Sequence, residues 1–101
     1  MSESVTLPKT KSRTQTERPK LYKVILLNDD FTPREFVVAV LKAIFRMTEG
    51  EALSVMLAAH QKGASVVAVF TREVAEEKAR TATEAGASEG YPLTFTTERE
   101  E

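Results

Sequence analysis

Four polar residues in this chain could do chemistry together: three consecutive short side chains, Asn28, Asp29 and Asp30, and the single histidine, His60. An amide oxygen, a carboxylate and a neutral imidazole all accept hydrogen bonds, whereas an ammonium group donates three. Asn28, Asp29 and His60 would therefore suit a primary amine. Each charge-assisted bond contributes roughly 1.5 to 3 kcal/mol, so three acceptors would hold a protonated amine and reject an acylated one.

Other interpretations of these residues remain open. Asn and Asp are common turn-forming residues, so 28–30 also fits a structural turn. A lone histidine on a mostly apolar helix face is by default a partly buried structural residue. A third alternative is a metal-dependent enzyme, because Asp29, Asp30 and His60 would supply two carboxylates and an imidazole. No spacing demands a metal, and there is no glycine-rich phosphate loop. We expect a binding protein without a cofactor, not an enzyme.

The acidic turn is preceded by a predicted strand and followed by a predicted helix. Residues 22–27, YKVILL, form a short apolar run rich in β-branched and aromatic residues, which is typical of a buried strand. After the turn, Thr32 is expected to be the helix N-cap, with Pro33 at the first helical position and Glu35 closing a capping box. Apolar residues at spacings of three and four extend this helix to about Arg46.

His60 belongs to a second predicted helix. Thr48 and Glu51 repeat the capping pattern, and the helix runs to about Gln61, before Gly63. One face of this helix is formed by Ala52, Met56, Ala59 and His60. We expect the apolar members of this face to line a small pocket beside the polar group. A ligand with an ammonium group and a large apolar side chain on the same carbon atom is the N-terminal residue of a peptide.

Two more strands and a third helix complete the predicted domain. Residues 65–70 are a second apolar run that we expect to pair at the centre of the sheet, and residues 72–87 form a helix rich in small residues. Residues 93–97 alternate apolar and hydroxyl side chains, which predicts a half-exposed strand. The order predicts an α+β fold, a β-α-α-β-α-β sandwich in which a three-stranded, mostly antiparallel sheet packs against three helices.

Composition and charge limit the class of protein. A chain of 101 residues is one domain, and we predict a disordered extension at 1–20, a folded domain at 21–97 and a charged tail at 98–101. The absence of cysteine favours a reducing, cytoplasmic compartment. The net charge of −1 gives no global field that would attract nucleic acid, and no apolar segment approaches the roughly 20 residues of a membrane span. We therefore expect no binding to nucleic acid or a membrane, and we expect a monomer. The alternative is a ribosome-associated or nucleic-acid-associated module that uses the basic residues of the extension: Lys9, Lys11, Arg13, Arg18 and Lys20.

Four segments resemble the ClpS family, bacterial adaptors of the ClpAP protease: YKVILLNDDFTPREFVVAVL, VMLAAH, VVAVFTREVAEEKA and YPLTF. The resemblance covers Tyr22 to about Thr96, and its motifs are specific, since NDD-x-TP and MLAxH occur at the family's expected separation. It implies an adaptor that recognises N-degrons, which are peptides beginning with a large hydrophobic residue such as Leu, Phe, Tyr or Trp, and delivers them to the protease.

The resemblance also implies roles for individual residues. The α-amino group of the ligand would be held by Asn28 and His60, with Asp29 binding the backbone beside it. The N-terminal domain of the ClpA unfoldase would dock on a surface that includes Glu73 and Lys78. The hydrophobic pocket would be formed by Leu26, Asp30, Thr32, Pro33, Arg34, Val37, Met56, Ala59 and Leu93.

Two positions depart from the family pattern. Many members have a Met where this chain has Arg34, at the pocket rim, and the aliphatic stem of an arginine can cover a rim while its guanidinium reaches solvent. Ala59 stands where a larger aliphatic residue is common, and this change enlarges the pocket floor. These departures leave the ranking among hydrophobic first residues open.

Overall fold

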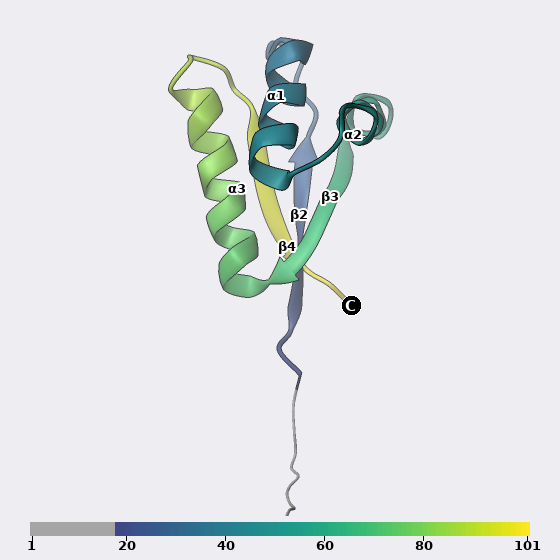
Figure 1. Cartoon of the computed structure of the whole chain (residues 1–101), viewed down its shortest axis with the longest axis vertical. Coiled ribbons are helices and arrows are strands. Elements are labelled where there is room, and N and C mark those ends of the chain that lie inside the picture. The colour runs from purple at the N-terminus through teal and green to yellow at the C-terminus, as the bar shows by residue number, and fades with distance from the viewer. Residues whose placement is uncertain (1–17) are drawn as a thin grey trace, which may run out of the picture.

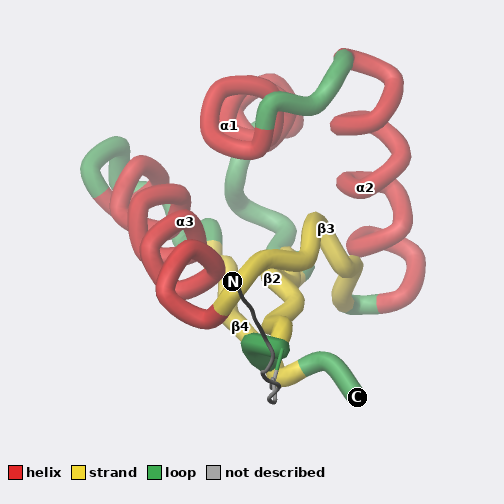
Figure 2. Tube along the Cα trace, turned by 60° about the horizontal axis from the view of Figure 1, so that its bottom comes forward, coloured by secondary structure: helices red, strands yellow, loops and turns green. Residues whose placement is uncertain are grey.

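The computed structural model describes residues 18–101 and contains three strands and three helices in the predicted order. All three helices lie on one face of the sheet (Figures 1 and 2), which confirms the predicted α+β architecture. Residues 1–17 of the predicted extension lie outside the described residues. The elements are β2 (Leu21–Leu27), α1 (Arg34–Phe45), α2 (Glu49–Lys62), β3 (Ala64–Thr71), α3 (Arg72–Ala87) and β4 (Thr94–Arg99).

The sheet is antiparallel throughout and has the order β3-β2-β4. The prediction that residues 65–70 pair centrally is therefore wrong, because β3 is an edge strand and β2 is the central one. An apolar run of six residues has the same appearance in either position. The register of β3 supports its edge position, since Val24 pairs with Ala68 and Ile25 with Val66, leaving Val67 as an extra residue in a β-bulge.

β4 is longer than the predicted strand and ends later. Glu98 pairs with Lys23, and Arg99 pairs with Tyr22, so two residues predicted for the charged tail belong to the sheet. The Lys23 ammonium and the Glu98 carboxylate lie 3.8 Å apart. Charged side chains are common on edge strands because they discourage pairing with another chain, and this explains why a strand end resembles a tail in sequence.

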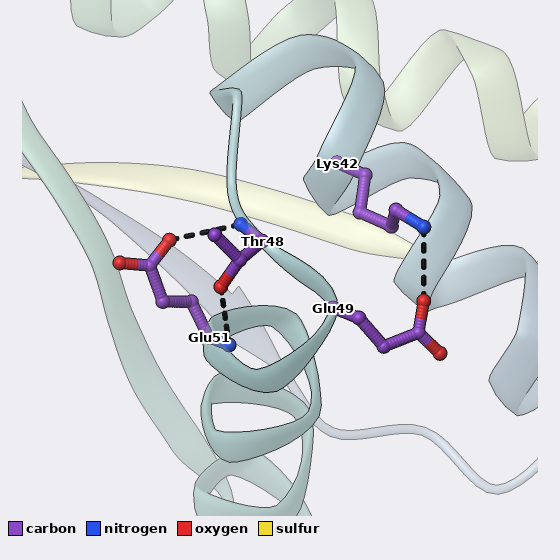
Figure 3. Close-up of polar contacts among 4 residues, drawn as sticks. All are labelled: Lys42, Thr48, Glu49 and Glu51. Atoms are coloured by element: carbon purple, nitrogen blue, oxygen red, sulfur yellow. Dashed lines mark hydrogen bonds and ion pairs between the residues drawn. The ribbon is translucent and has the colours of Figure 1, made fainter.

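The second helix starts as predicted. The Thr48 hydroxyl oxygen accepts a hydrogen bond from the Glu51 backbone N–H at 3.1 Å, and the Glu51 carboxylate accepts one from the Thr48 N–H at 2.9 Å (Figure 3). At the other end of α2, Gly63 adopts the left-handed conformation, with φ 91°, and its N–H donates to the carbonyl of Ala59. α2 is thus fixed at both ends by local interactions.

The capping box predicted for the first helix is wrong. α1 begins at Arg34 with Pro33 as N-cap, and no side chain caps it. The Thr32 hydroxyl instead donates to Asp29 Oδ2 at 3.0 Å, and the Thr32 backbone N–H donates to Asp29 Oδ1 at 2.7 Å. A capping hydroxyl would have to accept a hydrogen bond from a backbone N–H of the first turn of α1. The Thr32 side chain instead points to Asp29, and its hydroxyl donates to that carboxylate.

Small residues let α3 approach the sheet closely. Ala75, Ala79 and Ala82 are buried against it, and Gly86 faces Leu93, where an added Cβ would lie 2.8 Å from the Leu93 Cβ. Only glycine fits at position 86 without displacing Leu93.

None of the helices among residues 18–101 has the length and hydropathy that a membrane crossing requires.

Candidate functional site

A pocket of about 150 Å³ opens where the carboxyl end of β2 meets the start of α1 and the end of α2. It brings together residues from four separate parts of the chain. It is lined by Leu26, Leu27, Asn28, Asp29, Asp30, Thr32, Arg34, Val37, Met56, Leu57, Ala59, His60 and Leu93. The pocket therefore gathers the amine-directed residues and all the predicted pocket residues except Pro33.

The floor of the pocket is apolar and buried. β2 contributes Leu26, α1 contributes Val37, α2 contributes Met56 and Ala59, and Leu93 comes from the segment before β4, each at most 9% exposed. An apolar cavity of about 150 Å³ is large enough to bind benzene. The floor is thus suited to an aromatic or large aliphatic side chain.

The rim of the pocket is polar and open to solvent. Asn28, Asp30 and His60 are exposed there, so the default expectation that the histidine is partly buried is wrong. His60 lies in the last turn of α2, on the rim of the pocket and not in its buried floor. An exposed imidazole at a pocket rim is accessible to a ligand.

A backbone hydrogen bond sets the relative position of the two rim residues. The N–H of Asn28 donates to the carbonyl of Gly63 at 3.0 Å. Gly63 ends α2, three residues after His60, and its own N–H donates to the carbonyl of Ala59 at 2.7 Å. The end of β2 and the last turn of α2 are thereby joined, and Asn28 and His60 face the same opening.

Asp29 is both a turn residue and a pocket residue. Its Oδ1 accepts hydrogen bonds from the backbone N–H groups of Phe31, at 2.9 Å, and Thr32, at 2.7 Å, while Oδ2 accepts from the Thr32 hydroxyl. These three hydrogen bonds show that Asp29 has the structural role in the turn that its residue type suggested. A carboxylate offers about four lone-pair positions, so Oδ2 keeps capacity for one further donor from the pocket side.

Two residues that line the pocket were missed by sequence reasoning, and one predicted residue is absent from it. Leu57 lies one helical turn before His60, so its spacing could have predicted a place at the rim. No pattern in the sequence indicated that Leu27 lines the pocket. Pro33 is exposed and does not line the pocket, because it is the N-cap of α1 and its carbonyl accepts from the backbone N–H groups of Phe36 and Val37.

The acidic residues of the turn do not make a metal site with the histidine. Among residues 18–101, no three His, Cys, Asp or Glu side chains lie close enough together to hold a metal ion. The donor set required by the alternative of a metal-dependent enzyme, Asp29, Asp30 and His60, is therefore not assembled by the fold.

The two residues predicted to contact the unfoldase lie on α3. Glu73 is exposed in the first turn, and Lys78 is half-buried, with its ammonium donating to the carbonyl of Ile44 at 3.0 Å. Arg72, the first residue of the helix, pairs with Glu76, and this hydrogen bond raises the pKa of the arginine. The start of α3 lies at the opposite end of the sheet from the carboxyl end of β2 (Figure 1), which lines the pocket.

Fold and site together define a class: a small α+β domain with an apolar pocket whose rim carries hydrogen-bond acceptors. Comparison with known families gives a match over residues 17–96 to the ATP-dependent Clp protease adaptor protein ClpS. The chain belongs to the ClpS family, and its role is that of an adaptor of a Clp protease. Proteins of this adaptor class are in general not enzymes.

The relatives are similar over most or all of their length. The chain is 65% identical over 101 residues, the full length of both proteins, to the ATP-dependent Clp protease adapter protein ClpS 1 of Bradyrhizobium diazoefficiens. It is 66% identical over 96 residues, 93% of each protein, to ClpS 1 of Rhodopseudomonas palustris. The solved structure of Agrobacterium tumefaciens ClpS2 bound to L-phenylalaninamide matches with a TM-score of 0.81 at 60% identity, covering 82% of this chain and 100% of that one.

Proposed function

We propose that this protein captures peptides and proteins whose first residue has a free α-amino group and a large hydrophobic side chain (Leu, Phe, Tyr or Trp), and delivers them to the ClpAP protease. The observation that carries the proposal is the pairing of a buried apolar floor with an acceptor-bearing rim in one pocket. Support comes from the 60% identical ClpS2, which was solved with L-phenylalaninamide, a molecule that has an amine and a benzyl group on the same carbon atom.

The rim residues bind the ammonium group. The Asn28 amide oxygen and a neutral His60 imidazole accept two of its protons, and Asp29 Oδ2, which has spare capacity, accepts from the ligand backbone beside it. Each such bond contributes roughly 1.5 to 3 kcal/mol. The charge of Asp29 and of the neighbouring Asp30 adds a favourable field for a cation at this end of the pocket.

The floor binds the side chain of the first residue. Burial of a Leu or Phe side chain contributes roughly 1.5 to 3 kcal/mol. Ala59 at the floor leaves room for a ring, and Arg34 at the rim covers the ring edge with its aliphatic stem. Small first residues such as Gly or Ala leave the floor unfilled and bind weakly.

Delivery uses the other end of the molecule. We propose that a surface of α3, which includes Glu73 in its exposed first turn and the half-buried Lys78, contacts the N-terminal domain of the ClpA unfoldase. The start of α3 and the carboxyl end of β2, which lines the pocket, lie at opposite ends of the sheet (Figure 1), so one protein molecule can hold substrate and unfoldase at once. The proposal also takes the protein to act as a cytoplasmic monomer.

Calorimetric titration with amino-acid amides tests the binding step. L-Phenylalaninamide and L-leucinamide should bind, whereas glycinamide, which has the same ammonium and no side chain, should bind at least about tenfold more weakly because it forgoes the burial of an apolar group. Equal binding of phenylalaninamide and glycinamide would rule out the pocket as the site of recognition.

A further inference from the structure

A second groove adjoins the pocket on the outer side of the helix pair. It runs between α1 and α2 and shares Arg34 and Met56 with the pocket, so the two hollows meet at these residues. Its apolar surface comes from Val38 and Ala39 of α1 and from Leu53 of α2. Apart from the shared Arg34 and Met56, no residue of this groove takes part in the proposed contacts to the first residue of a peptide.

The side chains along the groove follow the helical repeat. On α1, Arg34, Val38 and Lys42 are spaced by four residues, and on α2, Leu57 and Leu53 are spaced in the same way. Both leucines are unusually exposed for their type, Leu53 at 39% and Leu57 at 40%. Leu57 lines the pocket and Leu53 lines the groove, so an apolar strip continues from one to the other.

An ion pair marks the far end of the groove. The Lys42 ammonium donates to the Glu49 carboxylate at 2.9 Å, joining α1 to the start of α2 (Figure 3). The distance along α1 from Arg34 to Lys42 is eight residues, or about 12 Å at the helical rise of about 1.5 Å. An extended chain advances about 3.3 Å per residue, so the groove accommodates about three to four residues.

We propose that this groove binds the peptide segment directly after the first residue, about residues two to four, and that it favours apolar side chains there. This inference rests on the proposed function, because the first residue must occupy the pocket for the following ones to reach the groove. Continuity indicates the occupant, because the exposed Arg34 at the pocket rim also lines the groove, and Met56 of the pocket floor lines both hollows. Arg34 then has a second task, donating hydrogen bonds to peptide carbonyls at the junction.

The experiment compares four ligands by calorimetry: phenylalaninamide, and amidated peptides in which Phe is followed by Gly-Gly-Gly, Leu-Gly-Leu or Gly-Leu-Gly. Side chains alternate along an extended chain, so one of the two leucine peptides should bind about threefold to tenfold more tightly than the glycine peptide, from partial burial of a leucine. Equal affinities of the three peptides would overturn the groove proposal.

Variants of α1 provide the matched control. Ala39 and Ala43 are both exposed alanines of the same helix, and only Ala39 lines the groove. Glutamine is a good helix former, so both Ala39→Gln and Ala43→Gln should fold. Ala39→Gln should abolish the advantage of the leucine peptide, Ala43→Gln should keep it, and both should bind phenylalaninamide like the unmodified protein.

The outcomes separate the two proposals. If phenylalaninamide binds but Ala39→Gln and Ala43→Gln have the same effect on the leucine peptide, the groove proposal is wrong and the pocket proposal stands. If phenylalaninamide itself does not bind the unmodified protein, both proposals fail.

Discussion

The backbone N–H of Asn28 donates a hydrogen bond of 3.0 Å to the carbonyl of Gly63, which ends α2. This bond joins the central strand to the helix that carries His60. The separation of the two rim residues is therefore set by backbone geometry and not by flexible side chains. A pocket whose polar groups are held in place before the ligand arrives loses less conformational entropy on binding.

The conformation of Gly63 is the first point at which this arrangement can be tested. Its φ of 91° is favourable only for glycine, so Gly63→Ala should lower the free energy of unfolding by about 1 to 2 kcal/mol and weaken binding of a Phe-initiated peptide. Urea denaturation measures the first effect. Gly50→Ala is the control, because Gly50 lies inside α2 with no atom near its Cβ position, and this change should not destabilise the domain. A Gly63→Ala variant as stable as the parent would contradict the argument.

Asn28 and His60 should contribute to affinity and not to stability. Both side chains are exposed, so Asn28→Ala and His60→Ala should leave the unfolding transition unchanged while each weakens peptide binding by at least about tenfold, the equivalent of one charge-assisted bond. Gln61→Ala is the matched control, since Gln61 is an exposed neighbour that does not line the pocket. Binding unaffected by both substitutions would remove these residues from the site.

Gly86 does not line the pocket, but its size should affect the position of a pocket residue, Leu93. A Cβ at this position would lie 2.8 Å from the Cβ of Leu93, which is part of the pocket floor. Gly86→Ala should therefore displace Leu93, cost about 1 to 3 kcal/mol of stability as overpacking does, and reduce the affinity for phenylalaninamide. Calorimetry and urea denaturation of the same variant measure both effects. Unchanged affinity would show that the floor tolerates the displacement.

Acidification should weaken peptide binding. A neutral imidazole accepts a hydrogen bond from the ligand ammonium, whereas an imidazolium has no acceptor and repels it, and imidazole side chains take up a proton between about pH 8 and pH 5. Affinity measured across this range should fall toward low pH in the parent protein and much less in His60→Ala. A flat profile in the parent would contradict the role of His60 as an acceptor.

Features decided by neighbouring residues in the sequence were predictable, and features decided by distant contacts were not. The capping box of Thr48 and Glu51 needs only residues three apart and was confirmed. The prediction that Thr32 caps the first helix was wrong, because the Thr32 hydroxyl points to the Asp29 carboxylate and donates to it. β3 is an edge strand because β4 pairs with β2 and not with β3. The apolar pattern of residues 65–70 contains no information about this pairing.

The candidate site was predictable for a different reason. The residue types of Asn28, Asp29 and His60 suggested an amine ligand beside an apolar helix face, and the family resemblance added distant pocket residues such as Leu26 and Leu93. The structure adds what neither could supply: the three bonds that occupy Asp29, the exposure of His60, and the contribution of Leu57 to the rim.

The central claim is that the pocket recognises a charged N-terminal amine together with the adjacent apolar side chain. The most direct measurement is fluorescence anisotropy of two labelled peptides that begin with Phe and differ only in acetylation of the α-amino group. The free peptide should bind with micromolar or tighter affinity, and the acetylated one at least about a hundredfold more weakly, because it cannot satisfy the acceptors of Asn28 and His60. Equal affinity of the two peptides would contradict the account.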